Sequence, residues 1–483
     1  MQEVQIGKFA AHYHLPPAAL TQWRRLDQVM KTVLDEALER ALASAGLPEN
    51  GELCLRQIRV PVRLRLASAD AALAAEWGQA LAAEIARALR DGRALFYHSR
   101  RQAWLDVAVS LARGDLQRIW AWRQLGLWRA RAAVSAGEAV FELVSAVAAE
   151  PAAVMPLLVA LAEAGWLESL AQRLTARQWV TLARAALHEA GALELLAETA
   201  DELLPETADT PSSRVAHDAW RVLNCSRLLP ALTAALAGAS RETCSAVAAL
   251  VVLEAEPARL RSDAAHALIG VIANALRAAR PEAKPALSEP VAIDEKAPDA
   301  NASPTVPRRE VETKVADLRQ RAWTRFGGLL FLLGLIEELE LVDEILAHPT
   351  LGARSFRWTM HRLALSLVPA EEADPAALAF AGLPPDAALP LEREPPGEIE
   401  SAALQMLAAR IVTHLGALLE WRDELAALLA FVCQRRAEIV AEPGWIDVKL
   451  ALDDVATEVR RAGLDLNPGF VPWLGVVVRF VYE

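Results

Sequence analysis

Sequence signatures of catalysis and of nucleotide binding are missing from this chain. Its 483 residues contain no GxGxxG or GxxxxGK[ST] phosphate loop, no HExxH zinc motif and no GxSxG nucleophile turn. Adjacent carboxylates such as Asp453 and Asp454 point in different directions on a helix and make a poor acid/base pair. We therefore expect a protein that is not an enzyme and has no cofactor; an enzyme whose site is formed by residues distant in the sequence is the alternative.

Cysteine and histidine are too scattered to predict a metal site. The 4 cysteines are Cys54, Cys225, Cys244 and Cys433. They form no CxxC pair, which is typical of reduced core thiols in a cytosolic protein. His12 and His14 have a spacing that can bind a metal on one strand face, but no third ligand is near in the sequence. We interpret them as surface or core histidines.

The chain also lacks a long apolar run and an excess of basic charge. Its best membrane candidate, "GGLLFLLGLI" at 327–336, is about half of the roughly 20 residues that a span requires. The opening sequence lacks the basic and apolar regions of a signal peptide. A net charge of −12 argues against broad nucleic-acid binding, which requires neutralised phosphates. We expect a cytoplasmic protein without a membrane or nucleic-acid partner.

What the sequence does contain is apolar material for a large core. Hydrophobic residues are 54% of the chain and charged residues 23%, a composition typical of globular proteins. The length suffices for two to four domains. The 14 tryptophans outnumber the 3 tyrosines. Tryptophan supplies a large area for burial, so this excess favours core or interface positions.

Residues 1–99 are predicted to form a small α/β module. The segment "LCLRQIRVPVRLRL" at 53–66 alternates apolar and polar residues, which predicts a half-buried strand with an edge or bulge at Pro61. The opening residues and "ALFYH" at 94–98 are weaker strand candidates. Helices are expected over about 17–45, and from a cap at Ser68, with an apolar ladder through Leu73, Trp77, Leu81, Ile85 and Leu89.

Residues 100–279 are predicted to be a helical domain. Glycines and prolines interrupt apolar helices of roughly 12 to 20 residues, which indicates packed helical hairpins without a fixed repeat. Thr175 and Gln178 have the spacing of a capping box. Residues 280–312 follow as a flexible linker, because prolines recur there. They are Pro281, Pro285, Pro290, Pro298, Pro304 and Pro307.

Residues 313–483 are predicted to be a second helical domain ending in a β-α-β element. Helices are expected over 313–347, 353–367, 398–418 and 419–437. "WIDVKLAL" alternates as a strand, Asp453 or Asp454 caps a helix that Gly463 ends, and "GVVVRFVY" is a buried last strand. The fold class is therefore mainly α, with packed helical hairpins and small α/β elements near the N-terminus and at the C-terminus: α+β overall.

Arginine and tryptophan are interleaved between residues 90 and 131. Side chains of these two kinds dominate protein–protein hot spots, which predicts a partner-binding surface. Its candidate residues are Arg100, Arg101, Trp104, Arg118, Trp120, Trp122 and Trp128. Two alternatives stay open: amphipathic helices with tryptophan in the core and arginine outside, and nucleic-acid binding, which the acidic chain disfavours.

Trp473 is a further candidate for partner binding. It lies in "RRAGLDLNPGFVPWLG", where Asn467-Pro468-Gly469 predicts a turn and Gly475 allows the last strand to begin. We interpret the run as a helix-to-strand crossover. Whether Trp473 packs inward or faces a partner is open at this point.

Four stretches, in order, resemble the tape measure protein family of contractile injection systems, the phage-tail-like secretion machines of bacteria. They are the opening strand-helix-strand-helix module, "FGGLLFLLGLIEELELVD" at 326–343, the Gly-Leu-Pro loop and helix at 380–418, and the closing "GWIDVKLALDD…VPWLGVVVRF". The sequence departs from the family at Leu333-Gly334-Leu335-Ile336, at His414-Leu415 and at the insertion before Pro472, which indicates a divergent member.

The resemblance implies a non-enzymatic assembly or structural component of a contractile injection system. Its partners would be other protein subunits, among them tube, baseplate or ATPase components. A length ruler would be one extended helical rod, whereas this chain is interrupted by prolines and glycines. A compact assembly protein fits the pattern better. The alternative is a helical-repeat scaffold or adaptor unrelated to injection systems.

Overall fold

A computed structural model describes residues 6–48, 51–129, 135–197, 212–236, 238–278, 317–387 and 394–483. These residues form two compact units. Unit one takes in the described residues up to 104 and residues 116–129, and unit two takes in residues 105–115 and the described residues from 135 onward. The boundary falls inside one helix, α4 (Arg100–Arg113). The predicted linker at 280–312 lies outside the described residues.

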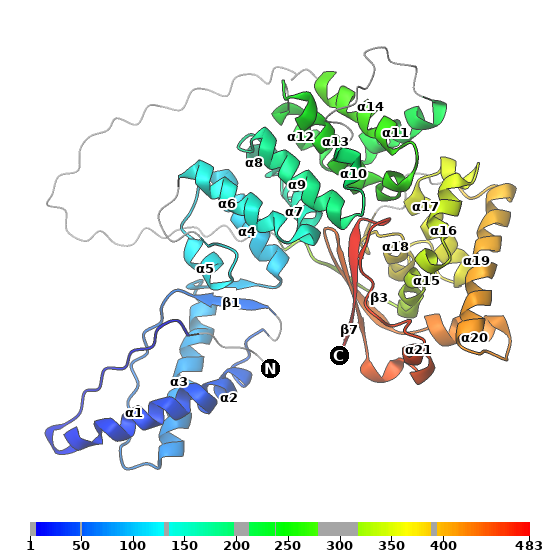
Figure 1. Cartoon of the computed structure of the whole chain (residues 1–483). Helices are drawn as coiled ribbons and strands as arrows, with labels where there is room; N and C mark the ends of the chain where they lie inside the picture. The colour runs from blue at the N-terminus through cyan, green and yellow to red at the C-terminus, as the bar shows by residue number, and fades with distance from the viewer. Residues whose placement is uncertain are drawn as a thin grey trace. The chain divides into compact units, whose positions relative to one another are not determined.

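Helices of unit one form where the apolar spacing predicted them. Its helical elements are η1 (Pro17–Gln22), α1 (Trp23–Thr32), η2 (Val33–Ala37), α2 (Leu38–Ala43), α3 (Asp70–Arg90) and α5 (Ile119–Gln124). The first four make one continuous run, which confirms the helix expected over 17–45, and α3 crosses it (Figure 1). Gly78 lets the backbones approach, because a Cβ there would lie 2.9 Å from the Ala37 carbonyl oxygen.

The ladder of apolar side chains predicted for this helix is confirmed in α3, but the N-cap predicted at Ser68 is not. Leu73, Trp77, Leu81 and Ile85 are buried, whereas Leu89 is only half-buried. The helix begins at Asp70 after Ala69, so Ser68 does not cap it. Ser68 instead offers its carbonyl oxygen to the Arg25 guanidinium at 2.6 Å.

The sheet of unit one is smaller than predicted. Strands β1 (Glu52–Leu55) and β2 (Ala94–Tyr97) pair antiparallel, which confirms the strand expected at 94–98. The strand expected over 53–66 was wrong beyond Leu55, because residues 57–64 have no strand beside them among the described residues. The opening segment is likewise extended and unpaired. The alternation itself is real, since residues 58–66 are half-buried and exposed in turn.

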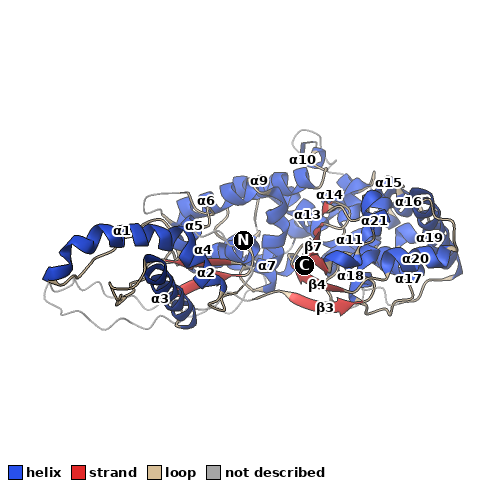
Figure 2. Cartoon of the chain, turned by 90° about the horizontal axis from the view of Figure 1, so that it is seen from below, coloured by secondary structure: helices blue, strands red, loops and turns tan. Residues whose placement is uncertain are grey.

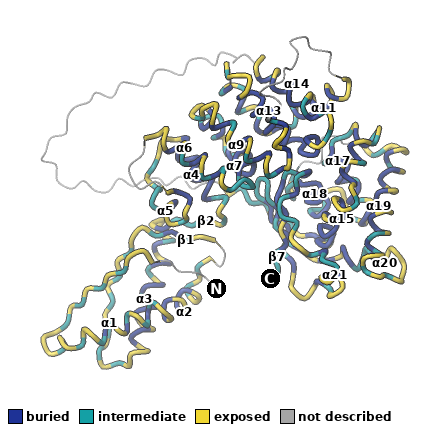
Figure 3. The backbone as a smooth tube through the Cα atoms, viewed as in Figure 1, coloured by how far each residue is buried: buried dark blue, intermediate teal, exposed yellow. Residues whose placement is uncertain are grey.

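Unit two contains a layer of packed helices, as predicted for 100–279. After α4 these are α6 (Ala136–Ala148), η3 (Pro151–Ala153), α7 (Val154–Glu163), α8 (Leu167–Ala171), α9 (Ala176–Glu189), α10 (Glu194–Ala197), α11 (Ser213–Cys225), α12 (Leu229–Ala235), α13 (Arg241–Ala255), η5 (Pro257–Arg261) and α14 (Ala265–Ala278). The capping box of Thr175 and Gln178 is confirmed. Helix α13 is buried almost along its length and packs against α9 and α14 (Figure 3).

A five-stranded mixed sheet forms the other part of unit two (Figure 2). Its strands are β3 (Gln320–Thr324), β4 (Ala437–Glu442), β5 (Trp445–Leu450), β6 (Gly469–Val471) and β7 (Val476–Tyr482), in the order β3-β4-β5-β7-β6. Strands β5 and β7 are parallel and the other pairs antiparallel, so the predicted β-α-β ending is confirmed. Strands β3, β4 and β6 were missed, and the helices expected over 313–347 and 419–437 were too long.

Helices cover this sheet and complete the region that was predicted as the second helical domain. They are η6 (Gly327–Leu332), α15 (Leu333–Glu338), α16 (Leu341–Ala347), η7 (Leu351–Ala353), α17 (Phe356–Leu367), α18 (Pro375–Phe380), α19 (Glu398–Leu418), α20 (Leu425–Cys433), η8 (Leu452–Asp454) and α21 (Thr457–Arg461). The bounds predicted for α19 are confirmed. The caps predicted at Asp453 or Asp454 were wrong, because both lie in η8 and α21 begins after Ala456.

Arginines join the two parts of unit two, and we call the buried Arg221 and Arg259 and the half-buried Arg357 the arginine cluster. Arg221 and Arg259 donate to the carbonyl oxygens of Ala353 and Gly352, each at 2.6 Å. Arg357 donates to the carbonyl oxygens of Glu254 and Leu474, each at 3.2 Å. Unit two therefore contains most of the 100–279 region together with the described part of the 313–483 region, which the sequence predicted as separate domains.

One described helix has the length and apolarity to cross a membrane, and a pair of helices bent by 112° has them only if the pair is counted as one span. The single helix is α19, and the bent pair is α6 with η3–α7. Helix α19 buries Leu404, Leu407 and Ile411 in the core of unit two. Core helices of water-soluble proteins have the same composition.

Thiol reactivity tests the burial of the cysteines. Cys54, Cys244 and Cys433 are buried, and burial raises the pKa of the Cys54 thiol to about 11 and that of Cys433 to about 12. Because the thiolate is the reactive form, we expect iodoacetamide at about pH 8 to modify native protein at Cys225, which is half-buried, and to spare the other three. Peptide mass spectrometry checks this, with unfolded protein as the control. Equal labelling of Cys54 and Cys225 in the native state would contradict it.

Candidate functional site

Half of the predicted partner-binding residues are core residues. Trp104, Trp122, Trp128 and Trp473 are each at most 2% exposed. The rings of Trp122 and Trp128 lie together, with centroids 5.8 Å apart, and Trp473 lies 5.8 Å from Phe356 in the core of unit two. Their assignment as partner contacts is thereby corrected, because a buried indole presents no surface to a partner.

The remaining four candidates lie at or near the surface. Arg100 is exposed and donates a hydrogen bond of 3.1 Å to the Leu125 carbonyl oxygen, while Arg101, Arg118 and Trp120 are partly buried. The region thus follows the alternative in which tryptophan fills the core and arginine faces outward. It does not gather the eight candidates into one surface.

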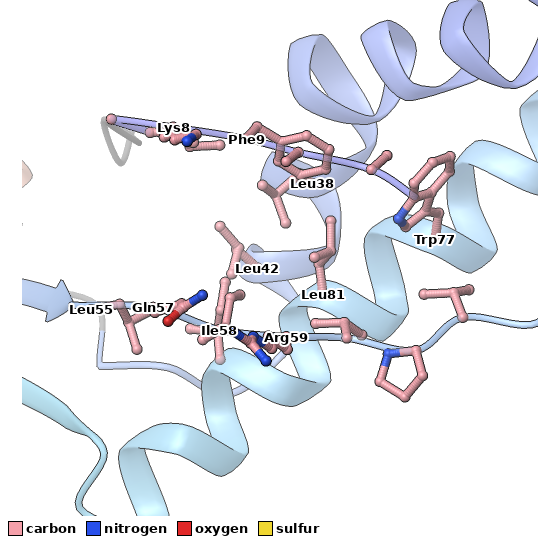
Figure 4. Close-up of a pocket in the computed structure, with 18 of the residues that line it drawn as sticks. Lys8, Phe9, Leu38, Leu42, Leu55, Gln57, Ile58, Arg59, Trp77 and Leu81 are labelled. Atoms are coloured by element: carbon pink, nitrogen blue, oxygen red, sulfur yellow. The ribbon is translucent and has the colours of Figure 1, made fainter. Parts of the chain in front are cut away.

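Unit one contains a groove of about 2370 Å³, which we call the N-terminal groove and which is bordered by residues 6–16 and 51–66 (Figure 4). Small-molecule sites commonly measure about 300–1,000 Å³. The groove is therefore large enough for a polypeptide segment. Its floor is formed by apolar side chains of the helices, among them Leu38, Leu42, Trp77 and Leu81.

One border of the groove is the extended segment 6–16. Phe9, Ala11 and Tyr13 pack against the core of unit one, while the residues between them are exposed. The Tyr13 hydroxyl donates to Asp27 Oδ1 at 2.8 Å, and its ring meets Trp77 edge-on at 6.3 Å. Burial and the Asp27 carboxylate raise the pKa of Tyr13, so this hydroxyl stays a donor. These contacts hold the segment on the helices without any strand pairing.

The opposite border is residues 56–66, and side chains hold it at both ends. Gln124 Nε2 donates to the Leu55 carbonyl oxygen at 2.9 Å, and Arg25 donates to the Leu66 carbonyl oxygen at 2.7 Å. Between these ends Ile58, Val60 and other apolar residues pack against the core of unit one. The segment is thus fixed in an extended conformation by anchors and by packing.

The backbone of both borders is unpaired. Residues 7–15 and 57–64 form no backbone hydrogen bond with any other residue that the structure describes. Backbone N–H and C=O groups in folded proteins are almost always paired with protein or water. Each border therefore presents a row of donors and acceptors, interrupted at Pro61 by the missing N–H, of the kind that an edge strand offers to another chain.

The rim of the groove is basic. Its lining includes 5 Lys or Arg residues and a single carboxylate, Glu52. Lys8, Arg56, Arg59 and Arg63 form no ion pair with any other residue in the described part of the chain. His12 and His14, the histidine pair noted in the sequence, lie on the exposed side of the first border. Positive charge of this kind selects acidic ligands.

The groove combines an apolar floor, a basic rim and unpaired backbone, which are features of a recognition surface. Within the described ranges, no group of three or more His, Cys, Asp or Glu residues is placed to hold a metal ion. A smaller cavity of about 50 Å³ in unit two is lined by Glu163, Arg227 and Glu254, whose side chains pair with one another. That volume holds no more than a few waters.

Sequence reasoning identified one border of the groove but not the groove. The alternation over 53–66 predicted which side chains face inward, and it also predicted a paired strand. What the sequence could not provide was the spacing between this segment and residues 6–16, which depends on long-range packing over the helices.

Comparison with known proteins identified no relative of this chain. No protein-family model matches the chain, and neither curated proteins nor solved structures give a significant match.

Proposed function

We propose that this protein is a non-enzymatic assembly or structural component of a bacterial contractile injection system. It is a divergent, tape-measure-like protein that acts in the cytoplasm through contacts with other subunits, such as tube, baseplate or ATPase components. The resemblance of four ordered stretches to that family motivates the proposal. The single structural observation that supports it best is the N-terminal groove, whose size and unpaired backbone suit a polypeptide partner.

The architecture favours an assembly role over a ruler. The longest single α-helices among the described residues, α3 and α19, have 21 residues each and are therefore about 30 Å long, and the continuous run from η1 to α2 ends at Ala43. Both pack into compact cores instead of continuing as a rod. A protein with helices of this length can hold or deliver other subunits, but it cannot span a long tube by helix length.

Deletion of the gene tests the proposal. In a strain that produces sheathed particles, we expect the deletion to abolish particles or to make them short or incomplete, and the full chain supplied from a plasmid to restore them. Electron microscopy of purified particles gives their number and length. Sheath, tube and baseplate genes beside this gene would be the expected neighbourhood.

Normal particles in the deletion strain would contradict the proposal. Together with a neighbourhood free of such genes, that result would favour the helical scaffold or adaptor. The packed helices α6 to α14 are the feature that such a scaffold would use.

A further inference from the structure

We propose that the N-terminal groove binds an extended segment of a partner subunit as an added β-strand, and that this segment alternates apolar with acidic residues. The inference rests on the proposed assembly function and names the partner's chemistry at the same site. Three observations carry it: unpaired backbone on both borders, an apolar floor, and a basic rim.

The backbone of the borders determines the conformation of the ligand. Residues 7–15 and 57–64 are extended and lack pairing with the other described residues. One strand between them would form ladders with both, as in other complexes formed by strand addition. The two borders run in the same direction, as the order Lys8 to Phe9 and Leu55 to Arg59 shows (Figure 4). A strand running the opposite way would be antiparallel to both, which is the more stable pairing.

The floor of the groove determines where apolar residues of the ligand lie. Side chains of a strand alternate between its two faces. Every second residue of the inserted strand would therefore contact Leu38, Leu42 and Leu81, which line the groove from below. The borders already obey this rule, since Phe9, Ala11 and Tyr13 face the core while His12 and His14 are exposed.

The basic rim determines the charge expected at the remaining positions of the inserted strand, between its apolar residues. Arg59 and Arg63 are exposed at alternate positions of one border, and Lys8 is exposed on the other. None of the three has an ionic partner among the described residues. Carboxylates on the outer face of the inserted strand would lie beside these cations, and cross-strand pairs of opposite charge stabilise a sheet.

The chain's own unassigned sequence is a poor match to this description. Residues 281–303 are acidic, but four prolines interrupt them, and proline cannot donate to a ladder. Residues 306–314 contain Glu310-Val311-Glu312, but this alternation covers only three residues and is flanked by Arg308, Arg309 and Lys314, which have the same charge as the rim. The occupant is therefore assigned to a partner protein.

Hydrogen exchange on the full chain is the direct test. We expect the amides of residues 7–15 and of 57–64 other than Pro61 to exchange rapidly in the free protein, because they have no partner, and those of β1 and β2 to be protected. The probe is a synthetic peptide of about nine residues that alternates valine with glutamate. Its addition should protect both borders and leave α3 unchanged.

Matched peptides and variants separate strand addition from charge attraction. A peptide with the same composition in two blocks, a peptide alternating valine with lysine, and the acidic peptide N-methylated at alternate residues should each bind at least about tenfold more weakly. The Arg59→Glu/Arg63→Glu variant should lose a similar factor for the acidic peptide. Its control, Lys31→Glu/Arg90→Glu, makes the same charge change at exposed residues of α1 and α3 outside the groove and should bind normally.

Several results would overturn the proposal. Protection of both borders in the free full chain would mean that a segment of this chain or a second copy fills the groove. Failure of the acidic peptide to protect them, tighter binding of the basic peptide, or equal binding after N-methylation would each contradict strand addition by an acidic segment. Normal particles from the Arg59→Glu/Arg63→Glu strain, with none from the deletion strain, would overturn this inference and leave the assembly function standing.

Discussion

We expect the Trp473→Ala variant to lose roughly 3–5 kcal/mol of the free energy of unfolding of unit two. The indole is 2% exposed and meets the Phe356 ring edge-on at 5.8 Å. Truncation would leave a cavity in the core of unit two, where β6, β7 and α17 meet. Urea unfolding followed by circular dichroism measures the loss.

The control for this prediction is another tryptophan of unit two. Trp220 is 60% exposed, so Trp220→Ala should change the free energy of unfolding by no more than about 0.5 kcal/mol. A Trp473→Ala protein with unchanged stability but defective particles would contradict the core assignment. It would return Trp473 to the partner surface that the sequence first predicted.

The second large effect is expected at Asp218, the carboxylate between two buried guanidinium groups. Arg221 and Arg259 both form ion pairs with Asp218, and Arg259 lies 3.3 Å from it. Burial lowers the pKa of Arg259, and the carboxylates of Asp218 and Glu256 oppose this shift. Asp218→Ala would remove the carboxylate that both buried cations share, leaving Glu256 at 3.9 Å from Arg221, and should cost roughly 3–5 kcal/mol.

Matched substitutions isolate the charge in this prediction. Asp218→Asn keeps the shape and one acceptor, so it should cost less than Asp218→Ala. Glu337→Ala removes an exposed partner of Arg261 and should cost at most about 1 kcal/mol. Thermal unfolding of the three variants under one buffer condition provides the comparison. Equal melting temperatures for Asp218→Ala and Glu337→Ala would show that the arginine cluster does not depend on its counter-charge.

The arginine cluster also explains why the predicted domain boundaries differ from the compact units. Proline-rich sequence at 280–312 predicts a separation between two helical domains. The structure instead places Arg221 and Arg259 of one region on carbonyl oxygens of residues 352–353 in the other. Gly475, with φ of 69°, adds a close approach, because a Cβ there would lie 3.0 Å from the Leu253 carbonyl oxygen. Contacts of this kind depend on the tertiary fold and leave no periodic signal.

Local patterns, by contrast, were predicted well from the sequence. Sequence alone predicted the helical run over 17–45, helix α19 and strands β5 and β7. The apolar spacing that identifies each of them lies within the element itself and does not depend on its packing partners. Strand β3 was missed because "QRAWT" is short and has no turn signal before it, and its identity depends on pairing with β4. The same limit applies to the N-terminal groove, where alternation in one segment was visible but the distance to the other segment was not.

The open borders of the N-terminal groove have a consequence for handling the isolated protein. Unpaired edges template the pairing of further chains and lead to aggregation. Arg59, Pro61, Arg63 and Arg65 occupy every second position of one border, where charge and proline oppose pairing with an identical copy. The arginines that would attract an acidic segment thus also keep two copies of this protein apart while the partner is absent.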